Sequence, residues 1–201
     1  MSSGKTTQAH RVDTATGLMA DARFCESPNA DDRPDATTVD TLILHSISLP
    51  PGDYGGPEIE DLFMNRLNPD DHPYFATLSG LEVSAHLLLR RDGELLQFVP
   101  FHRRAWHAGL SHFRGRTRCN DFSIGIEIEG SDDEAYTDEQ YVVLPRLVTA
   151  LLQAYPALTP RRIAAHSDIS PGRKTDPGPA FDWLRLYDGL RTAAESKKAC
   201  T

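Results

Sequence analysis

The sequence predicts an α/β fold, in a single domain with a central mixed β-sheet flanked by α-helices. Short β-rich apolar runs alternate along the chain with segments whose apolar residues recur at helical spacing, which is typical of intermixed strands and helices. The chain of 201 residues has the length of one domain, and such a chain buries roughly 70% of the surface that its unfolded form exposes. Its content of 39% hydrophobic and 25% charged residues is that of an ordinary globular protein.

The expected strands are short apolar runs bounded by turn-forming residues. They are a run ending at His45 and residues 83–89, 94–99, 122–130 and 162–166. Asp92-Gly93 is a strong hairpin signal between the second and third runs, so these two strands are expected to pair. The fourth run alternates strictly, with its isoleucines on one face and both Glu127 and Glu129 on the other.

The expected helices begin at Pro57, after Thr137 and at residue 183, the last one ending at residue 190. Thr137 and Gln140 form the signature of a capping box, and apolar residues keep a period of about 3.6 residues from there to residue 155. Pro145 lies inside this helix and is expected to kink it, because an interior proline costs about 3 kcal/mol.

Composition divides the chain into three parts. Residues 1–37 are polar and acidic with little periodicity, so we expect an N-terminal arm that is partly irregular. Residues 38–192 contain the expected strands and helices and are predicted to form the functional domain. Residues 193–201 are expected to be a C-terminal tail.

Charge and cysteine usage limit the class of protein. The chain has 21 basic and 29 acidic residues and a net charge of −8, which argues against broad nucleic-acid binding. No apolar run approaches the roughly 18 residues of a membrane span. The cysteines Cys25, Cys119 and Cys200 form neither a metal signature nor a disulfide framework, and the first forty residues lack an apolar signal segment. A cytosolic location without a membrane partner is therefore expected.

Two histidines stand where short apolar segments end and turn-rich loops begin. His45 and His166 are therefore expected to be delivered by strand ends into a cleft. Two imidazoles and one carboxylate make the ligand set of a catalytic zinc, whose fourth position is left for a water. By spacing alone, Asp168 and Asp176 both remain open as the third ligand. A solvated turn without a metal is the alternative for the whole loop.

The polar face of residues 122–130 offers a candidate general base. A carboxylate on an inner strand is costly unless it is paired or functional, and a base beside a metal-bound water needs such a position. Glu127 and Glu129 both meet this description. The alternative is an edge strand whose polar face meets solvent.

Residues 101–118 form a basic segment in an acidic chain. The segment contains five arginines and Trp106 but no aspartate or glutamate. Arginine pairs with carboxylates through two parallel hydrogen bonds, so the segment is suited to a ligand that carries carboxylates. Trp106 and His107 would form a wall for a sugar or peptide. The alternative is that these arginines pair with acidic residues elsewhere on the chain.

Five ordered stretches between about residues 41 and 183 match a known family. They are His45-Ser46-Ile47-Ser48-Leu49-Pro50-Pro51-Gly52, Val83-Ser84-Ala85-His86, Arg104-Ala105-Trp106-His107-Ala108-Gly109, Cys119-Asn120-Asp121-Phe122-Ser123-Ile124-Gly125-Ile126-Glu127 and Arg173-Lys174-Thr175-Asp176-Pro177-Gly178. On these stretches the chain resembles the cytosolic 1,6-anhydro-N-acetylmuramyl-L-alanine amidases of the AmpD type. This group belongs to the zinc amidase family, which is related to the peptidoglycan recognition proteins.

The resemblance implies one zinc ion per chain, held by His45, His166 and Asp176. It further implies that Glu127 is the catalytic carboxylate and that Lys174 is its partner near the metal.

The resemblance also places Arg118 and Asn120 where members of the family meet the muropeptide, and we add Trp106 and His107 as expected substrate contacts. Related phage and recognition-protein amidases carry a catalytic tyrosine just before the residue matched by His86. The residue there is Ala85 in this chain, which is consistent with Glu127 acting as the base.

Three departures from the family pattern leave the implied ligands intact. Ser46 stands where the family usually has asparagine, and Ser167 stands where it often has cysteine. Glu82 reverses the charge of an arginine proposed in some members to contact the stem peptide, so the resemblance does not extend to that contact.

The implied activity is hydrolysis of the amide between 1,6-anhydro-N-acetylmuramic acid and L-alanine of the stem peptide, by a cytoplasmic monomer in cell-wall recycling. One alternative is a non-catalytic muropeptide-binding module, as in recognition proteins that lack a zinc ligand. The other is a secreted amidase that acts on intact peptidoglycan.

Overall fold

The computed structural model describes residues 10–198. Residues 1–9 of the expected arm and residues 199–201 of the expected tail, including Cys200, lie outside this part. Cys25 and Cys119 are free thiols.

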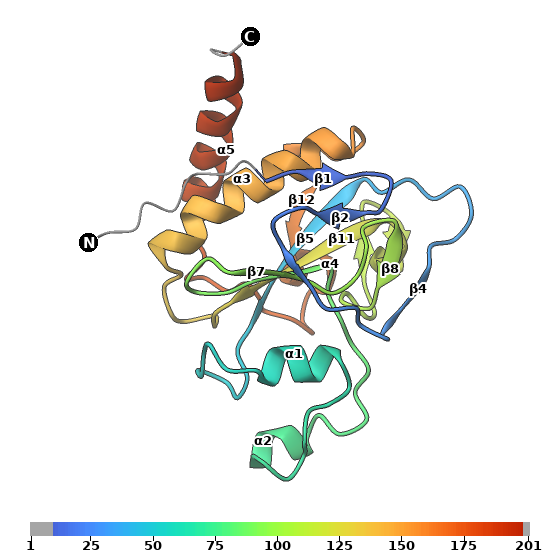
Figure 1. Ribbon diagram of the computed structural model, residues 1–201, viewed down its shortest axis with the longest axis vertical. Coiled ribbons are helices and arrows are strands. Elements are labelled where there is room, and N and C mark those ends of the chain that lie inside the picture. Colours follow the sequence, from blue (N-terminus) through green and yellow to red (C-terminus); the bar gives the residue numbers. More distant parts are fainter. Residues whose placement is uncertain (1–9, 199–201) are drawn as a thin grey trace.

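A sheet of six strands forms the centre of the molecule (Figure 1). In order across the sheet they are β12 (Ile163–Ala165), β5 (Thr41–Ile47), β11 (Ser123–Glu129), β6 (Leu87–Leu89), β7 (Leu95–Gln97) and β3 (Arg23–Phe24). Neighbouring strands are parallel except β6 and β7, which form the predicted antiparallel hairpin. Gly93 in its turn has a φ of 86°, a conformation that glycine adopts without strain. The predicted mixed sheet is confirmed.

The strand β11 lies in the middle of this sheet, and all seven of its residues are buried. Its isoleucines belong to the main hydrophobic core, while its glutamates face the opposite side. Glu127 lies beside His45 on β5 and Leu88 on β6. The edge-strand alternative is therefore wrong, because the strand has a partner along each side.

Helices cover both faces of the sheet (Figure 1). The long helices α3 (Asp138–Ala154) and α5 (Trp183–Lys198) lie on one side, and α1 (Glu58–Phe63) lies on the other, with α2 (Pro73–Ala76) beyond it. The short helices are α4 (His166–Ile169) and the 3-10 turns η1 (Cys119–Asp121) and η2 (Pro160–Arg162). The capping box of Thr137 and Gln140 opens α3 as predicted. None of the helices between residues 10 and 198 has the length and apolarity needed to cross a bilayer.

The helix α5 continues to Lys198, so the predicted end at residue 190 is wrong. Arg191 forms ion pairs with Asp188 at 3.6 Å and with Glu195 at 3.4 Å. Pairs at these spacings support the last turns of the helix, beyond its buried Leu186 and Leu190, and apolar periodicity cannot reveal these pairs. Residues 193–198 of the expected tail are therefore helical.

From residue 10 onward, the N-terminal segment packs on the rest of the chain. Besides β3, it contains β1 (Val12–Asp13), which pairs with β2 (Leu18–Met19), and β4 (Ala30–Asp32), which pairs with β8 (Arg103–Ala105). A further pair consists of β9 (His112–Phe113) and β10 (Arg116–Thr117). The guanidinium of Arg33, directly after β4, donates hydrogen bonds to the backbone oxygens of Phe101, Asn120, Asp121 and Ser123.

The helices α3 and α5 approach each other closely at Pro145 and Gly189. The helix α3 continues through Pro145 to Ala154. A Cβ on Gly189 would lie only 2.5 Å from Cγ of Pro145. The proline ring therefore occupies the space that a side chain at position 189 would need.

Gly189→Ala is expected to lower the Tm. Alanine usually stabilises a helix interior by about 1 kcal/mol relative to glycine, but here the added methyl overlaps the proline ring, and overpacking of this kind costs about 1–3 kcal/mol. Thermal unfolding followed by circular dichroism measures the change, with the exposed Asp188→Ala as a control on the same helix. A Tm equal to or above that of the unmodified protein would contradict this packing.

Candidate metal centre

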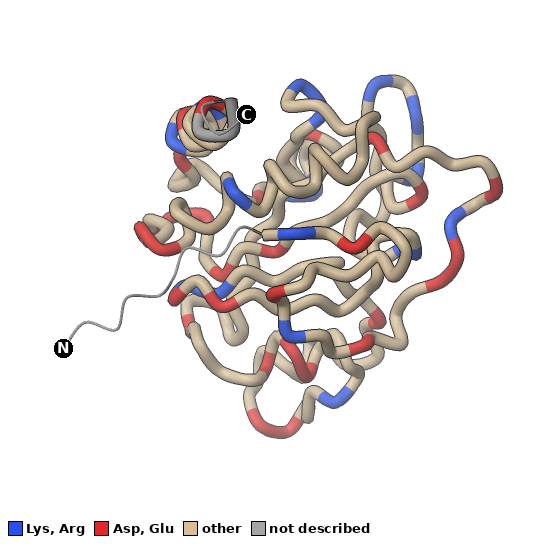
Figure 2. The backbone as a smooth tube through the Cα atoms, turned by 45° about the horizontal axis from the view of Figure 1, so that its top comes forward, with Lys and Arg blue, Asp and Glu red and all other residues tan. Residues whose placement is uncertain are grey.

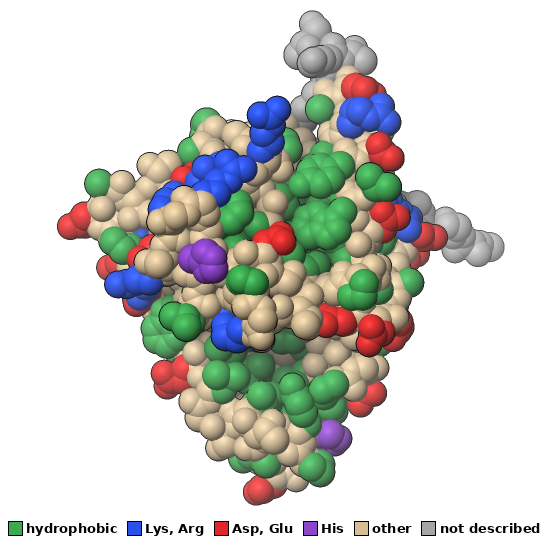
Figure 3. Space-filling view, turned by 180° about the vertical axis from the view of Figure 1, so that it is seen from behind, with side chains coloured by type: hydrophobic (Ala, Val, Ile, Leu, Met, Phe, Trp, Pro, Cys, Tyr) green, Lys and Arg blue, Asp and Glu red, His purple; other side chains and the backbone are tan. Residues whose placement is uncertain are grey.

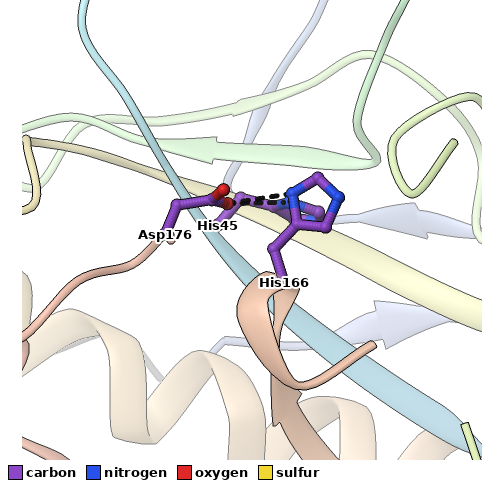
Figure 4. A group of neighbouring side chains, drawn as sticks. All are labelled: His45, His166 and Asp176. Atoms are coloured by element: carbon purple, nitrogen blue, oxygen red, sulfur yellow. Dashed lines mark hydrogen bonds and ion pairs between the residues drawn. The ribbon is translucent and has the colours of Figure 1, made fainter. Parts of the chain in front are cut away.

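Adjacent parallel strands bring the two candidate histidines together. His45 lies on β5, and His166 follows directly after β12, which pairs with β5 so that Ala165 lies beside Leu44. The Nδ1 atoms of the two imidazoles are 2.9 Å apart. Oδ2 of Asp176 lies 3.0 Å from Nδ1 of His166 and 3.3 Å from Nδ1 of His45 (Figure 4). We call these three residues the His/His/Asp cluster.

The donor set of the His/His/Asp cluster fits a zinc ion. Its three ligand atoms lie within 4.8 Å of one another. Zinc takes imidazole nitrogen and carboxylate oxygen at about 2.0–2.2 Å in a tetrahedron, whose edges are then about 3.3–3.6 Å long. The observed separations of 2.9 to 3.3 Å are close to that edge. The cluster is therefore a possible metal site.

The protonation states of the cluster suit a cation. Burial lowers the pKa of His45 to about 4, although the hydrogen bond with Asp176 opposes this shift. Burial alone would raise the pKa of Asp176, but hydrogen bonds with His166 and His45 hold that pKa below its usual range. At neutral pH His45 is thus neutral and Asp176 is charged, which are the forms that bind a metal.

Asp168, the other candidate for third ligand, points away from the cluster. Its Oδ2 accepts a hydrogen bond of 2.8 Å from the backbone N–H of Ala165, and its side chain is exposed. It therefore caps the N-terminus of α4.

The two glutamates of β11 differ sharply in their surroundings. Glu129 accepts hydrogen bonds from the backbone N–H groups of Gly55 and Arg91 and forms an ion pair with Arg90. Glu127 is 9% exposed, and its Oε2 atom has no hydrogen-bond partner among the described residues. Because a buried polar atom without a partner is costly, it marks a place where another group is expected to bind.

Burial raises the pKa of Glu127 well above its ordinary value. The charge of Asp176 raises it further, and Lys174 partly opposes the shift. A carboxylate with a raised pKa next to a metal site is suited to exchange protons with a reacting water near neutral pH.

A pocket of about 580 Å³ opens over these groups. Its lining includes His166, Asp176, Glu127, His107 and the exposed Lys174. The lining also includes a set of apolar or aromatic side chains, which we call the apolar wall: Leu49, Leu62, Tyr74, Leu78 and Leu81. In the space-filling view, hydrophobic side chains gather in a hollow in the lower half of the molecule (Figure 3).

The apolar wall is not predictable from the sequence. Its residues lie on α1, on α2 and in the loops beside them, at spacings that are equally typical of core residues. No sequence signal distinguishes them from the core.

Three expected substrate contacts do not line this pocket. Nε1 of Trp106 donates to Oδ1 of Asp31, and the exposed Arg118 pairs with Asp121 at 3.2 Å. Oδ1 of Asn120 accepts hydrogen bonds from the backbone N–H groups of residues 107 and 108.

The basic segment 101–118 meets carboxylates of the same chain. Arg104 pairs with Asp31 and Asp121, and Arg116 pairs with Asp40. Arg103 lies 3.9 Å from Glu26 and 3.8 Å from Asp32. Figure 2 shows basic and acidic residues interspersed along the outer loops. The alternative of internal pairing thus accounts for most of this segment.

Comparison with known proteins identifies the family of the chain. A family model described as N-acetylmuramoyl-L-alanine amidase matches residues 35–179. The chain is 55% identical to the 1,6-anhydro-N-acetylmuramyl-L-alanine amidase AmpD of Citrobacter freundii, over 90% of this chain and 96% of the relative. The crystal structure of a selenomethionine AmpD derivative has a TM-score of 0.86 at 52% identity, covering 89% of this chain and 98% of that one.

A third match is a complex of the Escherichia coli amidase AmiD with the substrate anhydro-N-acetylmuramic acid-L-Ala-D-γ-Glu-L-Lys. It has a TM-score of 0.56 at 29% identity and covers 78% of this chain and 60% of that one. The match at 55% identity covers nearly all of both sequences, and the family model spans the strands and loops that carry the His/His/Asp cluster and Glu127. The chain therefore belongs to the N-acetylmuramoyl-L-alanine amidase family.

Proposed function

We propose that this protein is a zinc-dependent amidase of cell-wall recycling. It hydrolyses the amide between 1,6-anhydro-N-acetylmuramic acid and L-alanine of the stem peptide. The observation that carries the proposal is the buried Oε2 of Glu127, on the strand that pairs with the strand of His45, which has no hydrogen-bond partner among the described residues. The 55% identity to AmpD supports the choice of substrate.

The residues of the pocket divide the work of amide cleavage. A zinc ion held by His45, His166 and Asp176 would lower the pKa of a bound water towards about 7 and polarise the scissile carbonyl. Glu127 accepts a proton from the attacking water as the new C–O bond forms. It returns a proton to the nitrogen of L-alanine as the C–N bond breaks, which leaves a carboxylate on the lactyl group and a free amine.

Lys174 provides a positive charge at the site. It lines the same pocket as Glu127 and Asp176. An ammonium at this position stabilises the negative charge that develops on the carbonyl oxygen in the transition state, a contribution worth about 3–4 kcal/mol for comparable donors. Acid–base work and charge stabilisation thus belong to different side chains.

The proposed enzyme acts in the cytoplasm, as a monomer, on soluble muropeptides. His107, Trp106, Arg118 and Asn120 remain the expected substrate contacts, of which only His107 lines the pocket of the resting structure. The apolar wall is available to parts of the muropeptide that carry no charge.

Release of peptide from a defined muropeptide tests the proposal. Protein loaded with one equivalent of zinc is expected to release L-Ala-D-γ-Glu-L-Lys from anhydro-N-acetylmuramic acid-L-Ala-D-γ-Glu-L-Lys, followed by chromatography and mass spectrometry. A chelator is expected to stop the reaction, and added zinc to restore it. Binding without release would instead indicate a recognition module, and equal release from intact sacculi would indicate a cell-wall amidase.

A further inference from the structure

His107 lies directly behind the metal ligand His45. Nε2 of His45 is 2.9 Å from Nδ1 of His107, and the two buried rings meet edge to face with an interplanar angle of 86°. His45 directs its other nitrogen, Nδ1, at His166 and Asp176. One imidazole therefore connects the candidate metal position to a second imidazole that does not reach it.

The hydrogen bonds around these rings define one consistent set of tautomers. A histidine that binds a metal through Nδ1 has no proton there, so Nε2 of His45 carries the hydrogen and donates it to Nδ1 of His107. Nδ1 of His107 is then an acceptor, and its Nε2 carries a hydrogen that points at Oγ of Ser123, 3.2 Å away. Oγ of Ser123 in turn donates to the backbone oxygen of Cys119 at 2.6 Å.

The ring of His107 is held tightly in this position. It packs on Gly125 of β11, where a Cβ would lie 2.5 Å from both Cγ and Nδ1 of the imidazole. Its backbone N–H donates to Oδ1 of Asn120 at 3.2 Å. The acceptor that faces His45 is thus fixed by a hydroxyl, a carboxamide and a glycine that leaves room for the ring.

Ala108, the residue after His107, contacts the other histidine ligand, His166. Nε2 of His166 lies 3.3 Å from the backbone oxygen of Ala108, and the N–H of Ala108 donates to Oδ1 of Asn120 at 2.7 Å. The same carboxamide therefore holds two consecutive residues, one of which faces each histidine ligand.

We infer that His107 is a positioning residue that fixes the tautomer and ring orientation of His45 for metal binding. Together with the backbone oxygen of Ala108, it gives both histidine ligands an outer hydrogen-bond acceptor on one segment anchored by Asn120. Partners of this kind orient metal-bound histidines and raise their basicity, and their removal typically weakens metal binding about 10- to 100-fold. The inference rests on the proposed zinc site and assigns His107 a role other than substrate contact.

Zinc affinity of two variants separates positioning from packing. His107→Leu removes the acceptor and is expected to raise the Kd for zinc by about 10- to 100-fold. His107→Asn keeps an oxygen at the place of Nδ1 and is expected to stay within a few-fold of the unmodified protein. Competition with a chromophoric chelator measures Kd, and His112→Leu, an exposed histidine on β9, is the control. Equal losses in His107→Leu and His107→Asn, or no loss in His107→Leu, would overturn the inference.

The tautomers can be measured in the unmodified protein, so this test does not depend on the folding of a variant. Long-range proton–nitrogen NMR spectra of the zinc-loaded protein are expected to show a protonated Nε2 on both His45 and His107. A proton on Nδ1 of His107 would refute the inference even in a fully active enzyme. If both rings show the expected tautomer but no muropeptide is cleaved, the proposed function fails and the positioning role stands.

Discussion

Glu127→Gln is expected to bind zinc as the unmodified protein does and to lose a factor of at least about 10²–10⁴ in kcat, the range that general acid–base catalysis contributes. The amide cannot accept the proton of the attacking water. Glu127 is not part of the His/His/Asp cluster, so its replacement leaves the three ligand atoms in place. Zinc content after dialysis and steady-state release of peptide measure the two effects, and Glu127→Ala is expected to behave in the same way.

The neighbouring glutamate on the same strand provides the matched control. Glu129→Gln weakens the ion pair with Arg90 and the hydrogen bonds from the N–H groups of Gly55 and Arg91. It is therefore expected to lower the Tm and to leave kcat within a few-fold. Glu127→Gln is expected not to lower the Tm, because Oε2 of Glu127 has no partner to lose among the described residues. Substantial turnover by purified, zinc-loaded Glu127→Gln would reject Glu127 as the base.

His166→Ala is expected to lose both zinc and activity. Only His45 and Asp176 would remain as ligands, and the lost imidazole also supplies a hydrogen bond that keeps Asp176 charged. A ligand that binds only the folded state stabilises it by about 4 kcal/mol at a thousand times its Kd. Added zinc is therefore expected to raise the Tm of the unmodified protein but not that of His166→Ala. Metal analysis after dialysis gives the second measurement.

Two aspartates that follow β12, Asp168 on α4 and Asp176 in the loop after it, provide a further test. Asp176→Ala is expected to lose zinc as His166→Ala does. Asp168→Ala is expected to keep both zinc and activity. It is expected to lower the free energy of unfolding by only about 1 kcal/mol, the value of a helix cap, because the carboxylate of Asp168 accepts a hydrogen bond from the N–H of Ala165. Stoichiometric, tightly bound zinc in His166→Ala would contradict the His/His/Asp cluster as the metal site.

Local sequence patterns predict the sheet well but not the neighbours of each strand. The alternation of residues 122–130 predicts a strand with two distinct faces, and β11 has them. Whether its polar face meets solvent depends on β5 and β6, which come from residues 41–47 and 87–89. The residue pattern of a single strand does not indicate which distant segments pair with it.

The site is predictable to a similar extent. The short apolar runs identify His45 and His166, although β5 continues past the predicted end at His45 to Ile47. The residues alone leave Asp168 and Asp176 open, because the choice depends on the path of the loop after α4. The basic segment has the composition of a binding surface. The arginines of this segment pair with Asp31 and Asp40, which come from the N-terminal part of the chain. A local sequence pattern does not predict ion pairs between residues so far apart in the sequence.

One face of β11 packs in the hydrophobic core, and the other face lines the pocket. Ile124, Ile126 and Ile128 pack into the interior on the side of α3, while the backbone between them carries Glu127 into the pocket. A redesign of this layer for heat resistance is expected to shift the carboxylate of Glu127 when side-chain volumes change, since a close-packed interior transmits strain. The outer surface of α5 lacks that linkage and is the safer place to add stability.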